Sequence, residues 1–347
     1  MKQFSSSPPD SALPALEGLV RQMVGAPASV AVREQRVNSR VYRLCCTMNG
    51  TTRSFVGKRL DPDIGRRNEL VARRWLPAVG VGDSAPRLLA VAAERDASSV
   101  WHLYQDLGAR GLDAARPDFG TVALAVVAIA RIHTRFAGHA LLPEVRLWGG
   151  DLGISFYVAS VRDASASLES VGARGRRRLG VERSSLCGRL LARLADLLDG
   201  QEARAEALTR SGGPETLLHG DLWPMNVMIG SSEGKTWARL IDWDHAAVGP
   251  VSYDLSTFLS RFPVPDRTRI LRLYEEEVGR AGWRLPSAAE LNLTFETAEL
   301  GRIANRVIWP ALAAWEENAD WAFDALEEVG RWFEQLTPIL PLDEACS

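Results

Sequence analysis

The sequence has few cysteines, no long apolar run and no excess of one charge. Its four cysteines are an adjacent pair and two distant residues, a spacing that fits neither a disulfide framework nor a zinc knuckle. No segment approaches the roughly 18 uninterrupted apolar residues of a membrane-spanning helix, and the N-terminus has no long apolar core of a signal peptide. We therefore expect a protein of the reducing cytoplasm that does not bind membranes.

The charge balance argues against a nucleic-acid partner. Lys and Arg together number 41 against 43 for Asp and Glu, so there is no basic excess to attract phosphate backbones. What the chain does have is length and apolar content, with 347 residues of which 46% are hydrophobic. Such a chain can bury a large core as one two-lobed unit or as two domains. Its oligomeric state is open between monomer and homodimer.

The predicted secondary structure of the chain changes from mostly strands to mostly helices near residue 105. Residues 1–26 predict a Ser/Pro-rich tail and a short helix, and 27–105 predict a small sheet with one main helix. Asn49-Gly50, between two strand-like runs, is a strong hairpin signal. Residues 106–347 predict mostly helices, with Pro310 marking a break because proline cannot donate its N–H. The sequence therefore predicts an α+β protein with a sheet-rich first part and a helical second part.

The candidate catalytic and metal-binding residues lie in the second part of the chain, within 106–347. In "LLHGDLWPMNVMIG", Asp221 precedes Asn226 by five residues, and Asp242 follows in the apolar run "ARLIDWDHAAVG". A carboxylate without a cationic partner can accept a proton from an attacking hydroxyl. Asn and Asp oxygens are hard ligands that suit Mg²⁺. Protein kinases use the same three residue types for phosphoryl transfer: one Asp orients the acceptor hydroxyl, and an Asn and a second Asp bind the metal ions.

The stretch "HGDLWPMN" resembles the catalytic loop of the aminoglycoside phosphotransferase/choline kinase superfamily, which shares the protein-kinase fold. The kinase pattern H-R-D-L-x-x-x-N is matched at His219, Asp221, Leu222 and Asn226, with Gly220 in the Arg position. "LIDWDHAAVGPVSYDLSTFL" resembles the segment that follows in this family, where a later Asp-Leu opens a helix. The resemblance implies a two-lobed protein-kinase-like fold, with a small antiparallel-sheet N-lobe (27–105) and a large helical C-lobe (106–347).

The resemblance also implies roles for individual residues. Asp221 would be the catalytic base, and Asn226 and Asp242 would be the Mg²⁺ ligands. The remaining polar residues of the two segments would support the loop, namely His219, Asp244 and Asp254. Asp244 would either join the site or brace Asp242.

The nucleotide side of the resemblance lies upstream. "FVGKRL" is similar to the strand that carries a phosphate-binding lysine, here Lys58, and "RRNELVARRWL" is similar to the helix whose glutamate, here Glu69, pairs with it. "YQDLG" is similar to the link between the lobes, which places Tyr104 at the back of the purine pocket. The Gln105 carbonyl and the Leu107 N–H would then face the base edge. A tyrosine in this position favours GTP as an accepted donor, unless its ring turns into the lobe core and ATP binds normally.

Two departures from the family and one further feature leave parts of this interpretation open. The nucleotide-covering loop is expected near "REQRVNSRVYRL" (33–44), which contains no glycine. Trp223 and Met225 replace smaller or polar residues of the antibiotic kinases, so the acceptor is not defined. Near the C-terminus Trp309, Trp315 and Trp321 lie close to several acidic residues. That pattern fits either a pocket for a cationic acceptor or an amphipathic helix with tryptophan in the core.

The predicted function is O-phosphotransfer, with Mg²⁺, from ATP or GTP to a hydroxyl of a small molecule. The acceptor would be an antibiotic, another secondary metabolite, or a small amino alcohol or sugar. One alternative is a metal-dependent hydrolase with ligands drawn from His219, Asp221, Asp242, Asp244 and His245. It leaves Lys58 and Asn226 without a role. The other alternative is a nucleotide-binding module without turnover, which the glycine-free loop would allow.

Overall fold

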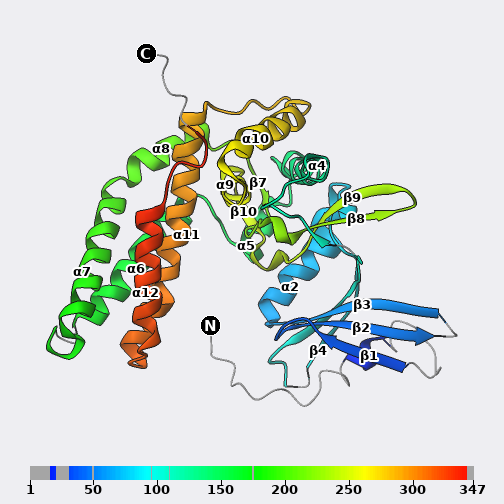
Figure 1. Cartoon of the computed structure of the whole chain (residues 1–347), viewed down its shortest axis with the longest axis horizontal. Coiled ribbons are helices and arrows are strands. Elements are labelled where there is room, and N and C mark those ends of the chain that lie inside the picture. The colour runs from blue at the N-terminus through cyan, green and yellow to red at the C-terminus, as the bar shows by residue number, and fades with distance from the viewer. Residues whose placement is uncertain are drawn as a thin grey trace. The chain divides into compact units, whose positions relative to one another are not determined.

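A computed structural model describes residues 16–20, 31–48, 51–94, 96–108, 110–173 and 176–341 (Figure 1). The chain divides into two compact units. We call the described residues within 2–149 and 219–246 the sheet unit, and those within 150–218 and 247–347 the helical unit. The predicted two-lobed α+β fold is confirmed. The predicted lobe boundary near residue 105 stays a prediction, since contacts place 219–246 together with the N-terminal part.

The sheet unit is built on a five-stranded antiparallel sheet with the order β1-β2-β3-β5-β4. Met48 pairs with Thr51, as a hairpin at Asn49-Gly50 requires, although that turn lies outside the described residues. The helical segment 16–20 packs Leu16 and Leu19 against apolar side chains of the sheet. The strands are β1 (Ala31–Arg36), β2 (Val41–Met48), β3 (Thr51–Leu60), β4 (Leu88–Ala93) and β5 (Val100–Gln105).

One long helical segment follows β3 and carries the predicted helix. It starts as α2 (Pro62–Leu70), continues as a π-helical turn (Val71–Trp75) and ends as α3 (Leu76–Ala78). Proline is tolerated in a first helical turn because its missing N–H would have no partner there. Trp75 is fully buried and donates to Glu144 of α5 (Leu142–Gly149) at 3.1 Å. The segment is thereby held against the rest of the sheet unit.

A second sheet of the order β6-β8-β9 includes the residues that directly follow the stretch "HGDLWPMN". Its strands are β6 (Arg110–Gly111), β8 (Val227–Ser232) and β9 (Lys235–Leu240). Helix α4 (Phe119–Phe136) packs against β8 and β9 and begins at Asp118, whose carboxylate accepts from two backbone amides. Across the described ranges α4 is the single helix that is long and apolar enough to cross a membrane. This is only weak evidence for a membrane-spanning segment, because core helices of soluble proteins pass the same test.

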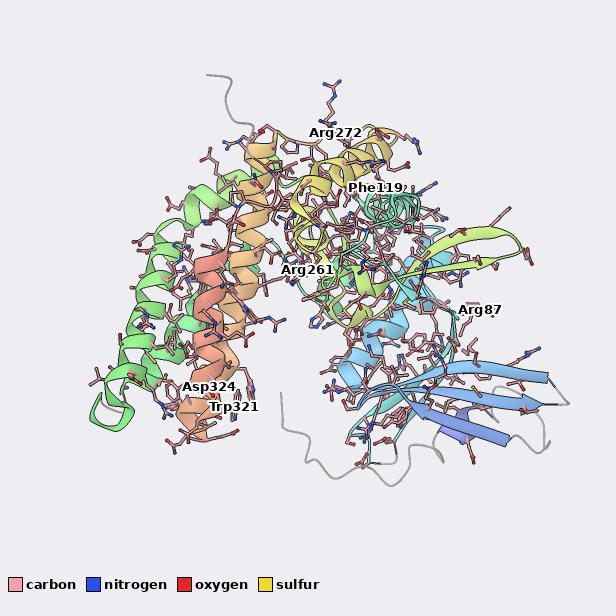
Figure 2. All side chains as sticks on the ribbon, in the orientation of Figure 1. Arg87, Phe119, Arg261, Arg272, Trp321 and Asp324 are labelled. Carbon is pink, nitrogen blue, oxygen red and sulfur yellow. The ribbon has the colours of Figure 1, made fainter. Side chains whose placement is uncertain are left out.

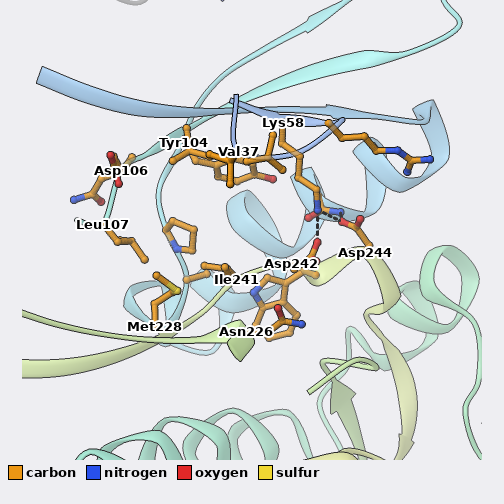
Figure 3. A pocket seen from close by; sticks show the side chains of 18 of the residues that line it. Val37, Lys58, Tyr104, Asp106, Leu107, Asn226, Met228, Ile241, Asp242 and Asp244 are labelled. Atoms are coloured by element: carbon orange, nitrogen blue, oxygen red, sulfur yellow. Dashed lines mark hydrogen bonds and ion pairs between the residues drawn. The ribbon is translucent and has the colours of Figure 1, made fainter. Parts of the chain in front are cut away.

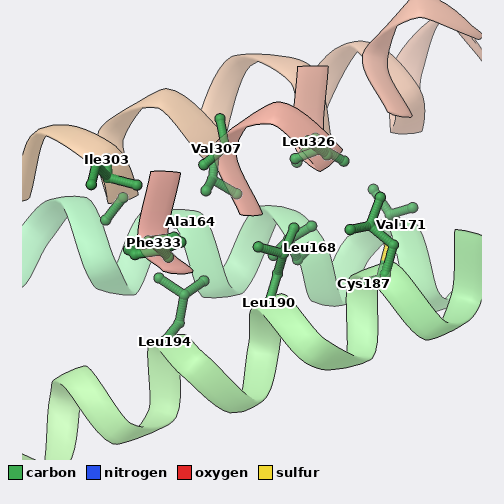
Figure 4. Packing of buried hydrophobic residues seen from close by; sticks show 14 of the residues in the cluster. Ala164, Leu168, Val171, Cys187, Leu190, Leu194, Ile303, Val307, Leu326 and Phe333 are labelled. Carbon is green, nitrogen blue, oxygen red and sulfur yellow. The ribbon is translucent and has the colours of Figure 1, made fainter. Parts of the chain in front are cut away.

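The helical unit has its core among four long helices (Figure 4). Leu168, Leu190, Val307 and Phe333 come from the four different helices and meet in one cluster. The helices are α6 (Ile154–Ala173), α7 (Arg176–Asp199), α11 (Ala288–Glu316) and α12 (Trp321–Gln335). The unit also contains α8 (Gln201–Ser211), α9 (Ser252–Ser260), α10 (Val264–Gly279) and the pair β7 (Glu215–Leu218) and β10 (Ala247–Pro250).

The predicted helix break at Pro310 is wrong. Helix α11 begins after a capping box formed by Ser287 and Glu290 and runs through Pro310 to Glu316. Pro310 is buried together with Ala311. Burial of an apolar face stabilises the helix on both sides of the proline, and this packing outweighs the loss of one backbone hydrogen bond.

Candidate functional site

The sheet unit contains a cavity of about 780 Å³, which lies against β2, β3, β5 and the segments around Asn226 and Asp242 (Figure 3). One part of its lining is apolar, and it includes Val41, Val56, Val71, Tyr104, Leu107, Met228 and Ile241. Another part is polar and includes Lys58, Asn68, Asn226, Asp242 and Asp244. A cavity with an apolar part and a few convergent polar groups is the usual form of a small-molecule site.

Lys58 lies at the centre of the polar part. It is on β3 with its side chain 14% exposed, and its ammonium contacts Asp242 and lies 2.7 Å from Oδ1 of Asp244. Burial alone would raise the pKa of the Asp242 carboxyl, but the charge and hydrogen bond of Lys58 outweigh it and lower that pKa. Asp242 also has a left-handed backbone, with φ 67° and ψ 56°, which is uncommon for a residue with a side chain. Such backbones concentrate at functional sites.

Asn226 is fixed by the loop that precedes it. Its side-chain NH₂ donates to the Asp221 carbonyl at 2.9 Å, and its own carbonyl accepts from the Ile241 amide at 2.9 Å. The NH₂ group makes the bond to the loop, so the side-chain oxygen of Asn226 can serve as a ligand. Together with the ionised carboxylate of Asp242 it offers the hard oxygen donors that Mg²⁺ prefers, so the residues present fit that metal.

Asp221 and His219 occupy the same loop. The Asp221 carbonyl also accepts from the Trp223 amide at 2.8 Å, which closes a tight turn. His219 is 1% exposed, and its Nε2 donates to the carbonyl oxygen of Ile241 at 2.8 Å. Its ring packs on Trp243 with the centroids 4.7 Å apart. His219 thus joins the loop before Asn226 to the segment that carries Asp242, and its role as a support of the loop stays a prediction.

The structure does not bring Glu69 to Lys58. Glu69 forms ion pairs with two arginines of its own helical segment, at 3.6 Å to Arg66 and 2.7 Å to Arg73. Residues three and four apart on a helix are neighbours, so these arginines are the partners within easiest reach. The preceding residue, Asn68, enters the site instead and donates to Asp244 at 2.9 Å. Sequence reasoning missed Asn68, since nothing in the helical pattern distinguishes it from Glu69.

Tyr104 lines the cavity while its hydroxyl points to a histidine. The hydroxyl lies 3.0 Å from Nδ1 of His102, which is 1% exposed. Burial, aided by the charges of Lys58 and Arg73, lowers the pKa of His102 to about 4, and burial raises the pKa of Tyr104. The histidine is therefore neutral, and its Nδ1 shares a hydrogen bond with the tyrosine hydroxyl. This contact fixes the side chain of Tyr104 against the cavity.

The segment that follows β5 is held in place by an ion pair and by hydrogen bonds. Asp106 forms an ion pair of 2.8 Å with Arg43 and accepts from the Gly108 amide at 3.0 Å. The Gln105 amide donates to the Arg87 carbonyl at 2.9 Å. Gln105 and Leu107 both line the cavity, as their predicted contact with a base edge requires. Their role in base recognition stays a prediction.

The glycine-free loop is closed by an asparagine. The side-chain oxygen of Asn38 accepts from the Arg40 amide at 2.8 Å and from the Val41 amide at 2.9 Å. Asparagine side chains commonly hold turns in this way. Residues 37–41 line the cavity, so this turn occupies the place of the expected nucleotide-covering loop without glycine.

Two further predicted features lie in the helical unit. Asp254 is 1% exposed within α9, and its role as a support stays a prediction. Trp309 and Trp315 are each 37% exposed and Trp321 is 42% exposed, so none of the three is a fully buried core residue. Trp321 and Asp324 both lie in the first turn of α12 (Figure 2).

The fold is that of the two-lobed, protein-kinase-like phosphotransferases. A family model described as the phosphotransferase enzyme family matches residues 48–291, and the chain belongs to this family. The resemblance predicted from the catalytic-loop motif is therefore confirmed. Comparison with curated protein sequences gave no significant match.

Three solved structures illustrate the shared fold. An aminoglycoside phosphotransferase from Streptomyces rimosus, in complex with ADP and streptomycin, is 19% identical with a TM-score of 0.50, covering 83% of this chain and 98% of that one. An ethanolamine kinase from Plasmodium vivax is 11% identical with a TM-score of 0.58, covering 93% and 86%. A spectinomycin phosphotransferase, in complex with ADP and spectinomycin, is 14% identical with a TM-score of 0.56, covering 90% of each chain.

Among the described residues, no group of three or more His, Cys, Asp and Glu side chains could hold a metal ion. The five ligands considered for a hydrolase, His219, Asp221, Asp242, Asp244 and His245, therefore do not converge on one point. The polar groups that do converge include Lys58, Asn68 and Asn226, which lie with Asp242 and Asp244.

Proposed function

We propose that the protein is a Mg²⁺-dependent kinase of small molecules, which transfers the γ-phosphoryl group of ATP or GTP to a hydroxyl group. The observation that carries this proposal is the cavity in which Lys58, Asn226 and Asp242 line a polar part beside an apolar part formed by residues such as Tyr104 and Ile241. An apolar part suits a purine, and a cation beside hard oxygen ligands suits phosphates with their metal.

Most of the predicted residues have a task in this reaction. Lys58 contacts the phosphates of the donor, while Asn226 and Asp242 hold Mg²⁺ through their side-chain oxygens. When bound, Mg²⁺ neutralises the charge that develops on the phosphate oxygens. Gln105 and Leu107 contact the base edge, and Tyr104 closes the back of the base pocket. Glu69, the predicted partner of Lys58, forms an ion pair with Arg73 instead, so the proposal gives it no direct contact with the donor.

Asp221 is the proposed catalytic base. Its carboxylate accepts the proton of the substrate hydroxyl as the oxygen forms a bond to the γ-phosphorus. The bond between that phosphorus and the bridging oxygen breaks, and the nucleoside diphosphate leaves with the electron pair. The products are the phosphorylated acceptor, the diphosphate and one proton. His219, Asp244 and Asp254 support the loop and the metal segment.

The acceptor is proposed by class. The solved structures of this fold include an aminoglycoside phosphotransferase in complex with streptomycin, a spectinomycin phosphotransferase and an ethanolamine kinase, and these three compounds carry both hydroxyl and amino groups. We propose an acceptor of the same class, meaning an antibiotic, another secondary metabolite, or a small amino alcohol or sugar. We place the reaction in the cytoplasm, in a monomer or homodimer.

The test is an acceptor screen with the purified protein, Mg²⁺ and either ATP or GTP. We expect one acceptor class to gain the mass of one phosphoryl group while an equal amount of ADP or GDP appears. The Asp221→Asn variant, which keeps the shape of the loop, is the matched control and should not form the product.

Two results would contradict the proposal. Release of inorganic phosphate from a phosphorylated compound, without any need for nucleotide, would favour a hydrolase. Binding of MgATP or MgGTP without turnover on any acceptor would favour a nucleotide-binding module.

A further inference from the structure

We propose that Asp244, held in place by α2, is the carboxylate that positions Lys58, and that Glu69 does not have this role. The inference rests on the proposed function for its consequence, the orientation of Lys58 toward the donor phosphates. Its structural basis is the set of contacts around the Asp244 side chain, which are independent of any nucleotide.

The Asp244 carboxylate receives two hydrogen bonds at the same oxygen. Lys58 donates to Oδ1 at 2.7 Å and Asn68 donates to it at 2.9 Å. The Asp244 side chain is 18% exposed, compared with 43% for the side chain of Asp242. The two carboxylates that contact Lys58 therefore differ, since Asp244 is enclosed by the protein and Asp242 is open to the cavity.

Helix α2 fixes Asp244 at both its side chain and its main chain. Asn68 is 5% exposed and donates its side-chain NH₂ to the Ile64 carbonyl, at 3.0 Å, as well as to Asp244. Arg67 donates to the Asp244 carbonyl oxygen and to the carbonyl of Trp148, the latter at 3.1 Å. A carboxylate held this firmly loses little further freedom when it binds an ammonium group, so it is well suited to orient Lys58.

Glu69 lacks this arrangement. Its carboxylate is engaged by Arg73 at 2.7 Å and by Arg66 at 3.6 Å, both on the same helical segment. Moving it to Lys58 would break both ion pairs. Helix α2 thus acts on Lys58 through Asn68 and Asp244 rather than through a direct glutamate contact.

Asp242 and Asp244 consequently have different roles, one toward the metal and the other toward Lys58. A metal ion held by Asp242 would share its carboxylate and would weaken the contact of that carboxylate with Lys58. Asp244 remains as the anionic partner that keeps the ammonium group in place. Asp244 is thus a positioning residue, which acts on the donor through Lys58.

The first experiment needs no nucleotide. The apoprotein is labelled with a small amine-acylating reagent, and the rate at Lys58 is followed by mass spectrometry. We expect Asp244→Asn to raise the rate several-fold, because the ammonium group loses its enclosed partner. Asn68→Leu leaves the carboxylate in place but removes its anchor, and should give a smaller rise.

Two matched variants complete the labelling experiment. Glu69→Gln should leave the Lys58 rate unchanged, and so should Asp83→Asn, which removes an exposed surface carboxylate paired with Arg131. An equal rise in Glu69→Gln and Asp244→Asn would overturn the proposal, as would an unchanged rate in Asp244→Asn. Because no turnover is involved, these outcomes are independent of whether the proposed kinase reaction is correct.

The second experiment is a double-mutant cycle on the affinity for MgADP and MgGDP, measured by calorimetry. Asp244→Asn should weaken binding about tenfold in the parent and change it by no more than about twofold in Lys58→Met, since the residue acts through Lys58. The same cycle with Glu69→Gln should be additive. If Asp244→Asn weakened binding equally in both backgrounds, Asp244 would act on the metal directly and the proposal would be wrong.

Discussion

Gly220 and His245 are in such close contact that a Cβ atom on Gly220 would lie 1.9 Å from the His245 carbonyl oxygen. Gly220 also has a φ of +80°, a conformation that residues with side chains rarely adopt. This position holds arginine in the protein-kinase pattern. The loop of this chain has no room for any side chain there, because the segment after Asp242 passes directly over it.

We predict that Gly220→Ala abolishes turnover and lowers the free energy of unfolding by several kcal/mol, since both the clash and the positive φ oppose the alanine. The matched control is Gly234→Ala in the turn between β8 and β9. Gly234 has a similar φ of +75°, but no atom lies within 4 Å of its Cβ position. That variant should lose only about 1 kcal/mol and keep its activity. Urea unfolding curves and kcat decide whether the close contact, rather than φ alone, makes Gly220 necessary.

Replacing the proposed base should separate turnover from binding. Asp221→Ala should lower kcat on the order of 10²–10⁴-fold, because a general base contributes about that much to proton transfer. Affinity for MgADP should stay close to that of the parent, as Asp221 acts on the acceptor. A folded Asp221→Ala protein with near-normal kcat would show that another group accepts the proton.

Asp242→Ala should affect nucleotide binding as well as turnover, unlike Asp221→Ala. Loss of a metal ligand that also contacts Lys58 should weaken the binding of MgADP as well as lower kcat. Calorimetric titrations at several Mg²⁺ concentrations measure this, with Asp221→Ala as the comparison. Unchanged affinity for the Mg²⁺-nucleotide complex in Asp242→Ala would rule out the metal role.

The sequence predicted residues of the cavity lining where they lie in short motif segments, as Asn226 and Asp242 do. Asp221 and Asn226 share one loop, in which the Asn226 side chain donates to the Asp221 carbonyl, and Asp242 follows the end of β9. A motif that specifies a local backbone therefore also specifies where these side chains lie. The same holds for the hairpin signal at residues 49–50, since turn chemistry is a local property.

Contacts between distant segments could not be predicted in the same way. The choice of Lys58 between Glu69 and Asp244 depends on competing arginines and on how closely α2 approaches residue 244. The bond of Tyr104 to His102 requires that both side chains share a strand face. Continuation of α11 through Pro310 depends on burial against other helices. In each case, packing between segments that are distant in the sequence decides which of the possible contacts forms.

His102 should make stability depend on pH. Its pKa in the folded protein is about 4, below the unperturbed value of about 6.5, so the unfolded chain binds more protons between these values. Stability is then fully present above about pH 6.5 and falls as the pH drops toward 4, by on the order of 3 kcal/mol. His102→Gln should flatten this dependence, whereas His139→Gln should not. Urea unfolding between pH 7 and 4 measures both, and an unchanged slope in His102→Gln would contradict the prediction.

The choice of nucleotide is predicted to depend on the ring of Tyr104. Its hydroxyl is bonded to His102, so the ring is held as part of the cavity lining. A ring of this size displaces the base outward, and adenine then loses hydrogen bonds to the Gln105 carbonyl and the Leu107 amide. Buried polar groups left unpaired cost about 1–3 kcal/mol, or roughly five- to 150-fold in selectivity. Guanine can pair with the same backbone groups in a shifted position.

We therefore expect the parent to accept GTP, and Tyr104→Met to shift the ratio of kcat/KM values toward ATP. Tyr104→Phe is the matched control, because it keeps the ring and removes only the bond to His102. If the size of the ring decides the donor, the phenylalanine variant keeps the parent ratio. If the bond to His102 decides it, the phenylalanine variant shifts as far as the methionine variant. A parent that strongly favours ATP, with the same ratio in Tyr104→Met, would show that Tyr104 does not contact the purine.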